Sequence, residues 1–304
     1  MNQDYIDTAR LMTQVAPLVF ADGVFALKGG TAINLFFREM PRLSVDLDLL
    51  FPDYALSRAE ALNRITKALR SSAERLKAHG FQTQRALTQD ATETKLMVRR
   101  GNIEIKIEVN FVLRGTLYPV RRMSLTAKAR SALLSDLELP VASVEDVYGG
   151  KLVAAMDRQH PRDLFDVMQL FAHGGITGGI RRAFVVYLAC HNRPIHEVLF
   201  PALRDIRQDY ERSFKGMTVN PVTLTELLET RERLISELQR NLDANERQFL
   251  LSLVQNNPQW SQLGFEHLQE LPGLRWKLRN LTQLAKANPK KFSEQADALR
   301  RLLG

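Results

Sequence analysis

The apolar positions of residues 24–112 alternate between short strand-like runs and longer helical runs. The short apolar runs 24–28 and 45–51 predict two strands, and the segment 31–39 between them predicts a helix that follows a glycine pair. The strand signal is clearest over 103–112, where isoleucine and valine alternate with charged residues. One face of that strand is therefore expected to pack in the core while the other carries charge.

Two further strands and one long helix complete the elements predicted for this half of the chain. The strands cover 81–87 and 93–100. The helix covers 57–79, where Ser57 is a suitable N-cap and Gly80 a suitable end.

From about residue 143 the pattern becomes that of consecutive helices. This change predicts an α+β domain followed by an all-helical domain. The glycine-rich stretch 174–179 is the expected boundary, which gives domains 1–173 and 174–304. The predicted helices cover 143–157, 161–172, 179–190, 195–213, 222–240, 243–255, 265–286 and 292–303.

Composition narrows the class of protein. A chain of 304 residues with 45% hydrophobic residues can bury a substantial core. It has no apolar run of the ~20 residues that a membrane span needs, and its first residues lack the layout of a signal peptide, so a cytoplasmic protein without membrane contact is expected. The single cysteine, Cys190, excludes an internal disulfide framework. The net charge of +8 favours polyanionic partners, although solubility alone is compatible with it.

Asp46 and Asp48 are unusual because they lie inside an apolar strand-like run. Side chains two residues apart in a strand share a face, so the two carboxylates are expected to project together. A magnesium ion would relieve their repulsion, since it prefers carboxylate oxygens and phosphates as ligands. The alternative is an edge strand that faces solvent, in which the aspartates serve solubility.

The Gly29-Gly30-Thr31 turn precedes the predicted helix at 31–39. Glycines allow backbone N–H groups to approach a phosphate closely, and the Thr31 hydroxyl adds a donor. Ser44 has the spacing to share the face of the aspartates, and Arg42 has the charge to reach a phosphate. The alternatives are an ordinary turn and a surface arginine.

Together these residues resemble a known signature. The run Gly29-Gly30-Thr31 followed by Arg42-x-Ser44-x-Asp46-x-Asp48 is similar to that of the polymerase-β-like nucleotidyltransferase superfamily. More narrowly, it resembles the AbiEii/MenT branch of nucleotidyltransferase toxins from bacterial toxin–antitoxin and phage-defence systems. The resemblance implies a core with a mixed sheet, in which Gly29, Gly30, Thr31, Arg42 and Ser44 bind nucleotide.

The superfamily also uses a third metal-binding carboxylate on a later strand. Glu108 in "IEIKIEVNF" matches it, and Glu104 on the same face is the alternative. The resemblance implies that Asp46, Asp48 and Glu108 hold two magnesium ions, which activate an attacking hydroxyl and stabilise the leaving pyrophosphate.

A second block, "GGKLVAAMDRQHPRDLFDV", resembles a later motif of the same branch. Lys151 matches its phosphate-binding lysine and Asp163 its catalytic-site aspartate, with Arg162 and Asp166 in supporting places. The alternatives are a solvated lysine for Lys151 and an acid at the start of a helix for Asp163.

Basic residues cluster at several places and would form a track for an RNA backbone if they flank one cleft. The alternative for each cluster is a solvated face. The clusters comprise Arg99, Arg100, Arg121, Arg122, Lys128 and Arg130 in the strand region, and Arg275, Lys277, Arg279, Lys286, Lys290 and Lys291 near the end of the chain.

These features predict a magnesium-dependent nucleotidyltransferase that moves a nucleoside monophosphate from an NTP to an RNA acceptor and releases pyrophosphate. The resemblance implies a toxin that modifies the tRNA 3′ end and is restrained by a cognate antitoxin. It also raises the hypothesis that phosphorylation of Ser44 silences the site, because a phosphate adds ~−1.5 to −2 charge beside two aspartates. Two alternatives remain: a degenerate module that only binds nucleotide or RNA, and transfer to a protein or a small molecule.

Overall fold

The computed structural model describes residues 3–87 and 93–304, and these form two compact units. The first unit runs to Val147 and includes Gly216–Pro221, whereas the second comprises Tyr148–Lys215 and Val222–Gly304. The chain passes from one unit to the other within helix α5 (Val144–Arg158). The predicted domain boundary at residue 174 stays a prediction.

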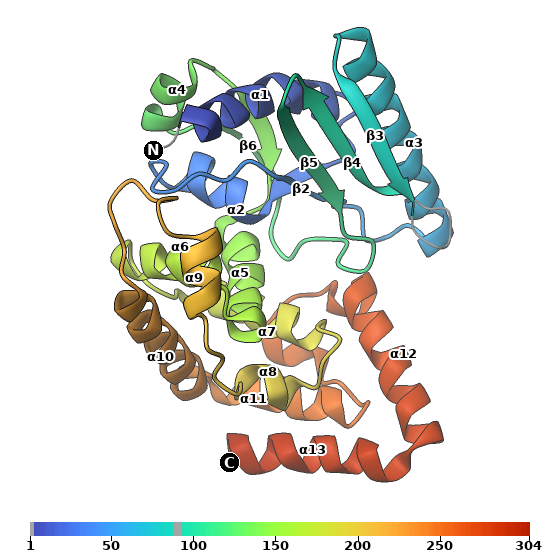
Figure 1. Cartoon of the computed structure of the whole chain (residues 1–304). Coiled ribbons are helices and arrows are strands. Elements are labelled where there is room, and N and C mark those ends of the chain that lie inside the picture. The colour runs from blue at the N-terminus through green and yellow to red at the C-terminus, as the bar shows by residue number, and fades with distance from the viewer. Residues whose placement is uncertain (1–2, 88–92) are drawn as a thin grey trace. The chain divides into compact units, whose positions relative to one another are not determined.

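The first unit contains, in its described part, a seven-stranded mixed sheet (Figure 1). Strand β1 pairs in parallel with β7, and β2 pairs in parallel with β5, while the other neighbours are antiparallel. The prediction of an α+β fold is therefore confirmed. In spatial order the strands are β3 (Gln82–Leu87), β4 (Glu93–Arg100), β5 (Ile103–Val109), β2 (Leu47–Leu50), β1 (Ala26–Lys28), β7 (Glu138–Val141) and β6 (Arg121–Ser124).

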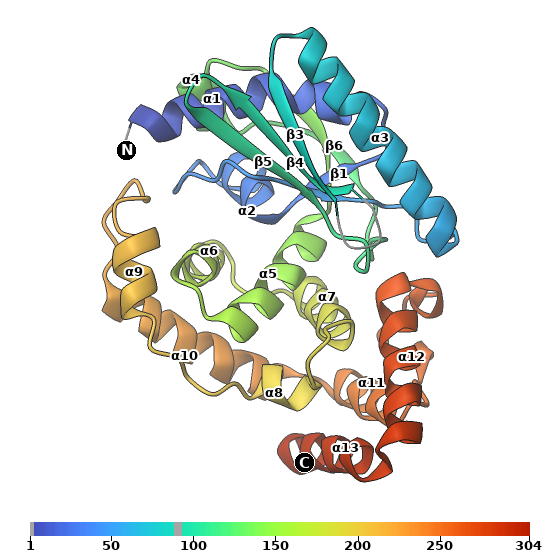
Figure 2. The same cartoon turned by 45° about the vertical axis from the view of Figure 1, so that its right-hand side comes forward.

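Helices cover the apolar face of this sheet. Helix α1 (Gln3–Phe20) packs on β5 and β7, and α3 (Arg58–Ala78) packs on β3 and β4 (Figures 1 and 2). The face beneath them is fully buried, with Leu27, Leu47 and Ile107 at 0% exposure. Burial of side chains of this size contributes roughly 1.5–3 kcal/mol each. The opposite face of β2 and β5 is thereby left to carry polar side chains.

Two shorter helical segments complete the first unit. The segment α2 (Gly29–Ala32) continues directly into the wider turns of η1 (Ile33–Phe37), and α4 (Ala127–Leu133) packs against α1. None of the helices in the described residues is long and apolar enough to cross a lipid bilayer.

The second unit is helical, as expected. Its helices contact one another in sequence-distant pairs, including α6 with α10 and α7 with both α11 and α12. They are α6 (Pro161–Ala172), α7 (Gly178–Ala189), α8 (Ile195–Leu199), α9 (Arg207–Ser213), α10 (Leu224–Asn241), α11 (Ala244–Val254), η2 (Trp260–Leu263), η3 (Leu268–Glu270), α12 (Pro272–Ala287) and α13 (Pro289–Leu303), with most of α5.

The prediction of one helix over 195–213 is wrong. Helix α8 ends at Leu199, and α9 starts only at Arg207. Pro201 accounts for the break, because proline lacks the N–H that a helix needs and disfavours helical backbone in the residue before it. That residue, Phe200, has φ −122° and ψ 69°.

Replacement of the adjacent glycines Gly149 and Gly150 of α5 by alanine is expected to change stability in opposite directions. A Cβ at Gly149 would lie 2.7 Å from the Ala183 Cβ and 2.8 Å from its backbone carbon, whereas a Cβ at Gly150 would meet nothing within 4 Å. G149A is therefore expected to lower the free energy of unfolding by about 1–3 kcal/mol through overpacking against α7. G150A is expected to raise it by about 0.5–1 kcal/mol, because alanine favours the helix. Urea unfolding measures both, and equal effects would contradict the close contact between α5 and α7.

Lys277 is buried, which contradicts its inclusion in a surface track of basic residues. Its Nζ donates hydrogen bonds to the carbonyl oxygens of His191 (2.7 Å) and Arg193 (2.8 Å). Burial lowers the pKa of Lys277 to about 8. The role of this lysine is therefore to hold the backbone after α7.

This lowered pKa predicts a pH dependence of stability. Between pH 8 and the ordinary pKa of 10.5, the unfolded state binds the proton of Lys277 more tightly than the folded state does. The free energy of unfolding of the wild type, measured relative to K277M, is thus expected to rise with pH across this window. The slope is at most about 1.4 kcal/mol per pH unit. A flat or falling difference in urea unfolding would contradict the assignment.

Candidate active site

The glycine turn lies where strand β1 ends and the helical segment α2 begins, as predicted. Gly29 has φ +74°, which favours glycine, and a Cβ there would lie 2.9 Å from both Cβ and Cγ of Asp48. A Cβ at Gly30 would lie 2.8 Å from the Ser44 Oγ and 2.9 Å from an Arg42 Nη2. The absence of both side chains therefore lets Asp48, Ser44 and Arg42 lie directly against the turn.

Hydrogen bonds fasten the segment before β2 to this turn. The buried Thr31 hydroxyl donates to the backbone oxygen of Asp46 (2.5 Å) and lies 3.1 Å from the Ser44 Oγ. Arg42 is also buried, and its Nη1 donates to the backbone oxygen of Leu43 (2.9 Å). Thr31 and Ser44 thus hold the approach to β2 in place. Their binding of nucleotide stays a prediction.

Four charged residues form a row across neighbouring strands. Asp48 on β2 is the register partner of Glu108 on the parallel strand β5. Lys28 on β1 lies opposite Asp48, and Lys95 on β4 lies opposite Glu108. We call Lys28, Asp48, Glu108 and Lys95 the charged row. The two carboxylates are brought together as predicted, whereas Asp46 lies just before β2 and not inside it.

Lysines compensate the carboxylates of this row. Glu108 Oε1 lies 3.4 Å from the Lys95 Nζ, and its Oε2 lies 2.9 Å from the Lys106 Nζ. Partial burial acts to raise the pKa of Glu108, but its interactions with Lys106 and Lys95 outweigh burial and hold that pKa below its usual value. Glu108 is therefore ionised at neutral pH.

Lys106 interacts electrostatically with all three predicted metal ligands. Its hydrogen bond to Glu108 is the largest cause that raises its pKa, and the charges of Asp46 and Asp48 act in the same direction. Burial lowers the pKa of Lys28, against the opposing charges of Asp48 and Glu108. One ammonium group therefore lies within the field of three carboxylates, where a metal ion would be attracted as well.

The site contains the carboxylates that a magnesium site needs, but they are not arranged around a common metal position. Carboxylate oxygens are the ligands that magnesium prefers, and Asp48 and Glu108 are adjacent on one face. Within residues 3–87 and 93–304, however, no group of three or more His, Cys, Asp or Glu side chains is arranged to hold a metal ion. Metal binding by Asp46, Asp48 and Glu108 stays a prediction.

The second motif forms a buried ionic cluster in the second unit. The Lys151 Nζ on α5 lies 2.8 Å from Asp163 Oδ1 and 3.0 Å from Asp166 Oδ2, both on α6. Arg158 Nη2 approaches the other oxygen of Asp163 at 2.7 Å. The side chains of Lys151, Asp163 and Asp166 are 9%, 5% and 0% exposed.

This cluster changes the reading of the motif. Lys151 is not a solvated surface lysine, because it is buried between two aspartates. Asp163 does more than begin a helix, because it forms ion pairs with Lys151 and Arg158. Arg162, by contrast, is exposed. Phosphate binding by Lys151 and a catalytic part for Asp163 stay predictions.

Three lysines of the site, Lys28, Lys95 and Lys106, were not predicted from the sequence. The alternation Glu104-Lys106-Glu108 could have indicated Lys106, since residues two apart share a face of a strand. Lys28 and Lys95 depend on the pairing of strands, which one sequence does not reveal. Among the other basic residues, Arg99 is paired with Glu104 (2.6 Å) and Arg122 with Glu138 (2.7 Å), both at exposed positions.

A mixed sheet that sets a glycine turn beside a carboxylate pair on neighbouring strands is the arrangement of a nucleotidyltransferase. Residues 10–280 match the family described as nucleotidyl transferase AbiEii toxin of type IV toxin–antitoxin systems. The chain belongs to this AbiEii family of nucleotidyltransferase toxins.

A solved structure supports the fold. MenT4, a nucleotidyltransferase toxin from Mycobacterium tuberculosis H37Rv, is similar with a TM-score of 0.59 and 19% sequence identity, over 92% of this chain and 94% of that one. A complex of CdnC with HORMA-deltaN from E. coli MS115-1 matches with 14% identity over 89% of this chain and 90% of that chain. Its TM-score is 0.24, which is too low to indicate a shared fold. No curated protein sequence matches the chain significantly.

Proposed function

We infer that the protein transfers a nucleoside monophosphate from an NTP to an RNA acceptor, the tRNA 3′ end, with magnesium, and that a cognate antitoxin restrains it. The observation that carries this proposal is the charged row, in which Asp48 lies against the glycine turn and beside Glu108 on the next strand. Magnesium held by Asp46, Asp48 and Glu108 would supply positive charge for the phosphates and the leaving pyrophosphate.

The chain's own residues have distinct parts in this proposal. The backbone at Gly29 and Gly30 allows phosphates to come close, and the Arg42 guanidinium beside the turn adds positive charge. Lys151 supplies a further compact charge, which Asp163 and Asp166 hold in one position. Asp163 also orients the acceptor. The basic net charge of +8 favours RNA as the acceptor.

A labelling assay tests this proposal. The purified protein is incubated with magnesium, total tRNA and each of four NTPs labelled at the α-phosphate. We expect label on the RNA and an equal amount of released pyrophosphate, with both lost when the metal is chelated. Binding of tRNA without transfer would instead indicate a degenerate binding module, and label on protein or on a small alcohol would identify a different acceptor.

A further inference from the structure

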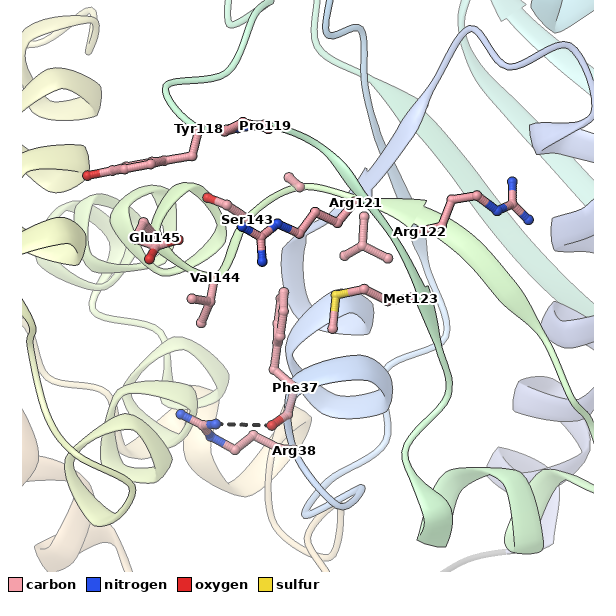
Figure 3. Close-up of a pocket in the computed structure, with 12 residues that line it drawn as sticks. Phe37, Arg38, Tyr118, Pro119, Arg121, Arg122, Met123, Ser143, Val144 and Glu145 are labelled. Carbon is pink, nitrogen blue, oxygen red and sulfur yellow. Dashed lines mark hydrogen bonds between the residues drawn. The ribbon is translucent and has the colours of Figure 1, made fainter. Parts of the chain in front are cut away.

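A cavity of about 520 Å³ lies in the first unit. Its walls come from the end of η1, strand β6, the end of β7 and the first residues of α5 (Figure 3). In the sheet order β5-β2-β1-β7-β6, Asp48 and Glu108 lie on one side of β1 and this cavity on the other. Its volume is within the ~300–1,000 Å³ typical of sites for small ligands. None of the residues predicted for the active site lines it.

The walls of the cavity are largely apolar and include an aromatic ring. Phe37 and Met123 lie on one side and Val144 lies across from them (Figure 3). An aromatic ring stacks on any nucleobase, and a methionine thioether adapts to flat ligands. The cavity therefore suits a planar ring system.

The cavity wall also carries charged side chains of both signs, Arg121 from β6 and Glu145 from α5. Figure 3 shows Arg121 extending from β6 toward Ser143 at the start of α5, whereas Arg122 extends the other way. This follows from the alternation of side chains along a strand, which puts Arg121 on the face of Met123. Arg122 is paired with Glu138 at 2.7 Å.

Arg121 and Glu145 have no such partner. Within the described residues, neither the Arg121 guanidinium nor the Glu145 carboxylate makes an ion pair or hydrogen bond. Arg38 adds a second guanidinium to the lining, where its Nη1 donates to the Phe37 carbonyl oxygen (3.0 Å). The guanidinium groups match a phosphate, and the carboxylate accepts hydrogen bonds from a base amino group.

We propose that this cavity is a second nucleotide site, which binds a nucleotide unit with an amino-bearing base between Phe37 and Val144. Arg121 holds its phosphate and Glu145 accepts from the amino group. Adenine, cytosine and guanine carry such an amino group, whereas uracil does not. The unit belongs either to a free nucleotide or to an RNA strand, and both sources present the same chemistry. The site does not depend on transfer at the charged row.

Binding is measured in variants that all carry D48N. Because none of them is expected to transfer nucleotide, differences in transfer activity cannot influence the comparison. Calorimetry compares AMP, CMP and UMP, and the trinucleotides of A and U, without NTP or metal. We expect AMP and CMP, or the A trinucleotide, to bind at least about tenfold more tightly than the uracil counterparts. R121M is expected to weaken binding about tenfold or more, because it removes a hydrogen bond to a charged group. E145Q should reduce the discrimination against uracil.

R122M is the matched control, because Arg122 also belongs to the cavity wall and carries the same charge, but its guanidinium is paired with Glu138 and extends the other way. It is expected to leave affinity unchanged, and F37L should weaken binding while the thermal melt stays that of the parent. Preference for the monomers identifies a free nucleotide as the source, and preference for the trinucleotide identifies RNA. Absence of binding at millimolar concentration, equal loss in R121M and R122M, or no preference between A and U would overturn the proposal.

Discussion

D48N is expected to reduce the proposed nucleotide transfer by at least about 10²–10³-fold. Asparagine keeps the shape of the side chain but removes the negative charge that a cation needs, and loss of one strong electrostatic contact at a reacting centre costs about this much. Incorporation of α-labelled NTP into tRNA at saturating substrate measures the effect. Circular dichroism and the melting temperature show whether the variant is folded, since Asp48 also faces Lys28 across β1 and β2.

Strand β5 offers a matched pair of controls for this result. Glu104 and Glu108 lie on the same face of the strand, but only Glu108 is the register partner of Asp48. Glu104 is instead paired with Arg99 at 2.6 Å, at an exposed position. E108Q is therefore expected to lose transfer as D48N does, and E104Q to retain it. Activity lost in E104Q and kept in E108Q would show that the third carboxylate has been assigned to the wrong residue.

D166A is expected to lower the free energy of unfolding by about 3–5 kcal/mol. Asp166 is fully buried and lies 3.0 Å from the Lys151 Nζ, so its removal leaves a buried ammonium group with half of its compensation. Breaking a buried ion pair by removing one partner typically has an effect of this size. Urea unfolding measures it, and because Trp260 and Trp276 both lie in the second unit, tryptophan fluorescence follows the unit concerned.

E211A provides the comparison. Glu211 and Lys215 in the same unit are separated by 2.8 Å, a similar distance, but both side chains are more than half exposed. Solvent screens such a pair, so its loss is expected to change stability by less than about 1 kcal/mol. If D166A were no more destabilising than E211A, the buried cluster of Lys151, Asp163 and Asp166 would not be the stabilising element that its geometry implies.

The glycine turn and the main carboxylates could be predicted from sequence because each depends on local pattern. Gly29 and Gly30 stand between a strand and a helix, and Glu108 stands in a strictly alternating strand. The row that connects them required the pairing of β1, β2, β5 and β4, which depends on contacts distant in the chain. That is why Lys28 and Lys95 were not found.

Elements with weak local signals were missed for related reasons. Strand β6 reads Arg-Arg-Met-Ser at the edge of the sheet, and three of its four residues are exposed, so no apolar alternation marks it. Strand β7 contains Pro140, which argues against a strand when only sequence is considered. Helix α1 continues through Pro17, where a helix is expected to end. The cavity proposed as a second nucleotide site takes part of its wall, including Arg121 and Met123, from these unpredicted strands.

The most direct test of the site at the charged row is the position of a metal ion bound with nucleotide. Crystals soaked with manganese and a non-hydrolysable NTP would show the ion by its anomalous scattering. We predict an ion bound by Asp48 and Glu108, with Glu108 released from Lys95 and Lys106 and with the phosphates against Gly29 and Gly30. Manganese and nucleotide bound elsewhere, while Glu108 keeps both lysine contacts, would contradict the account.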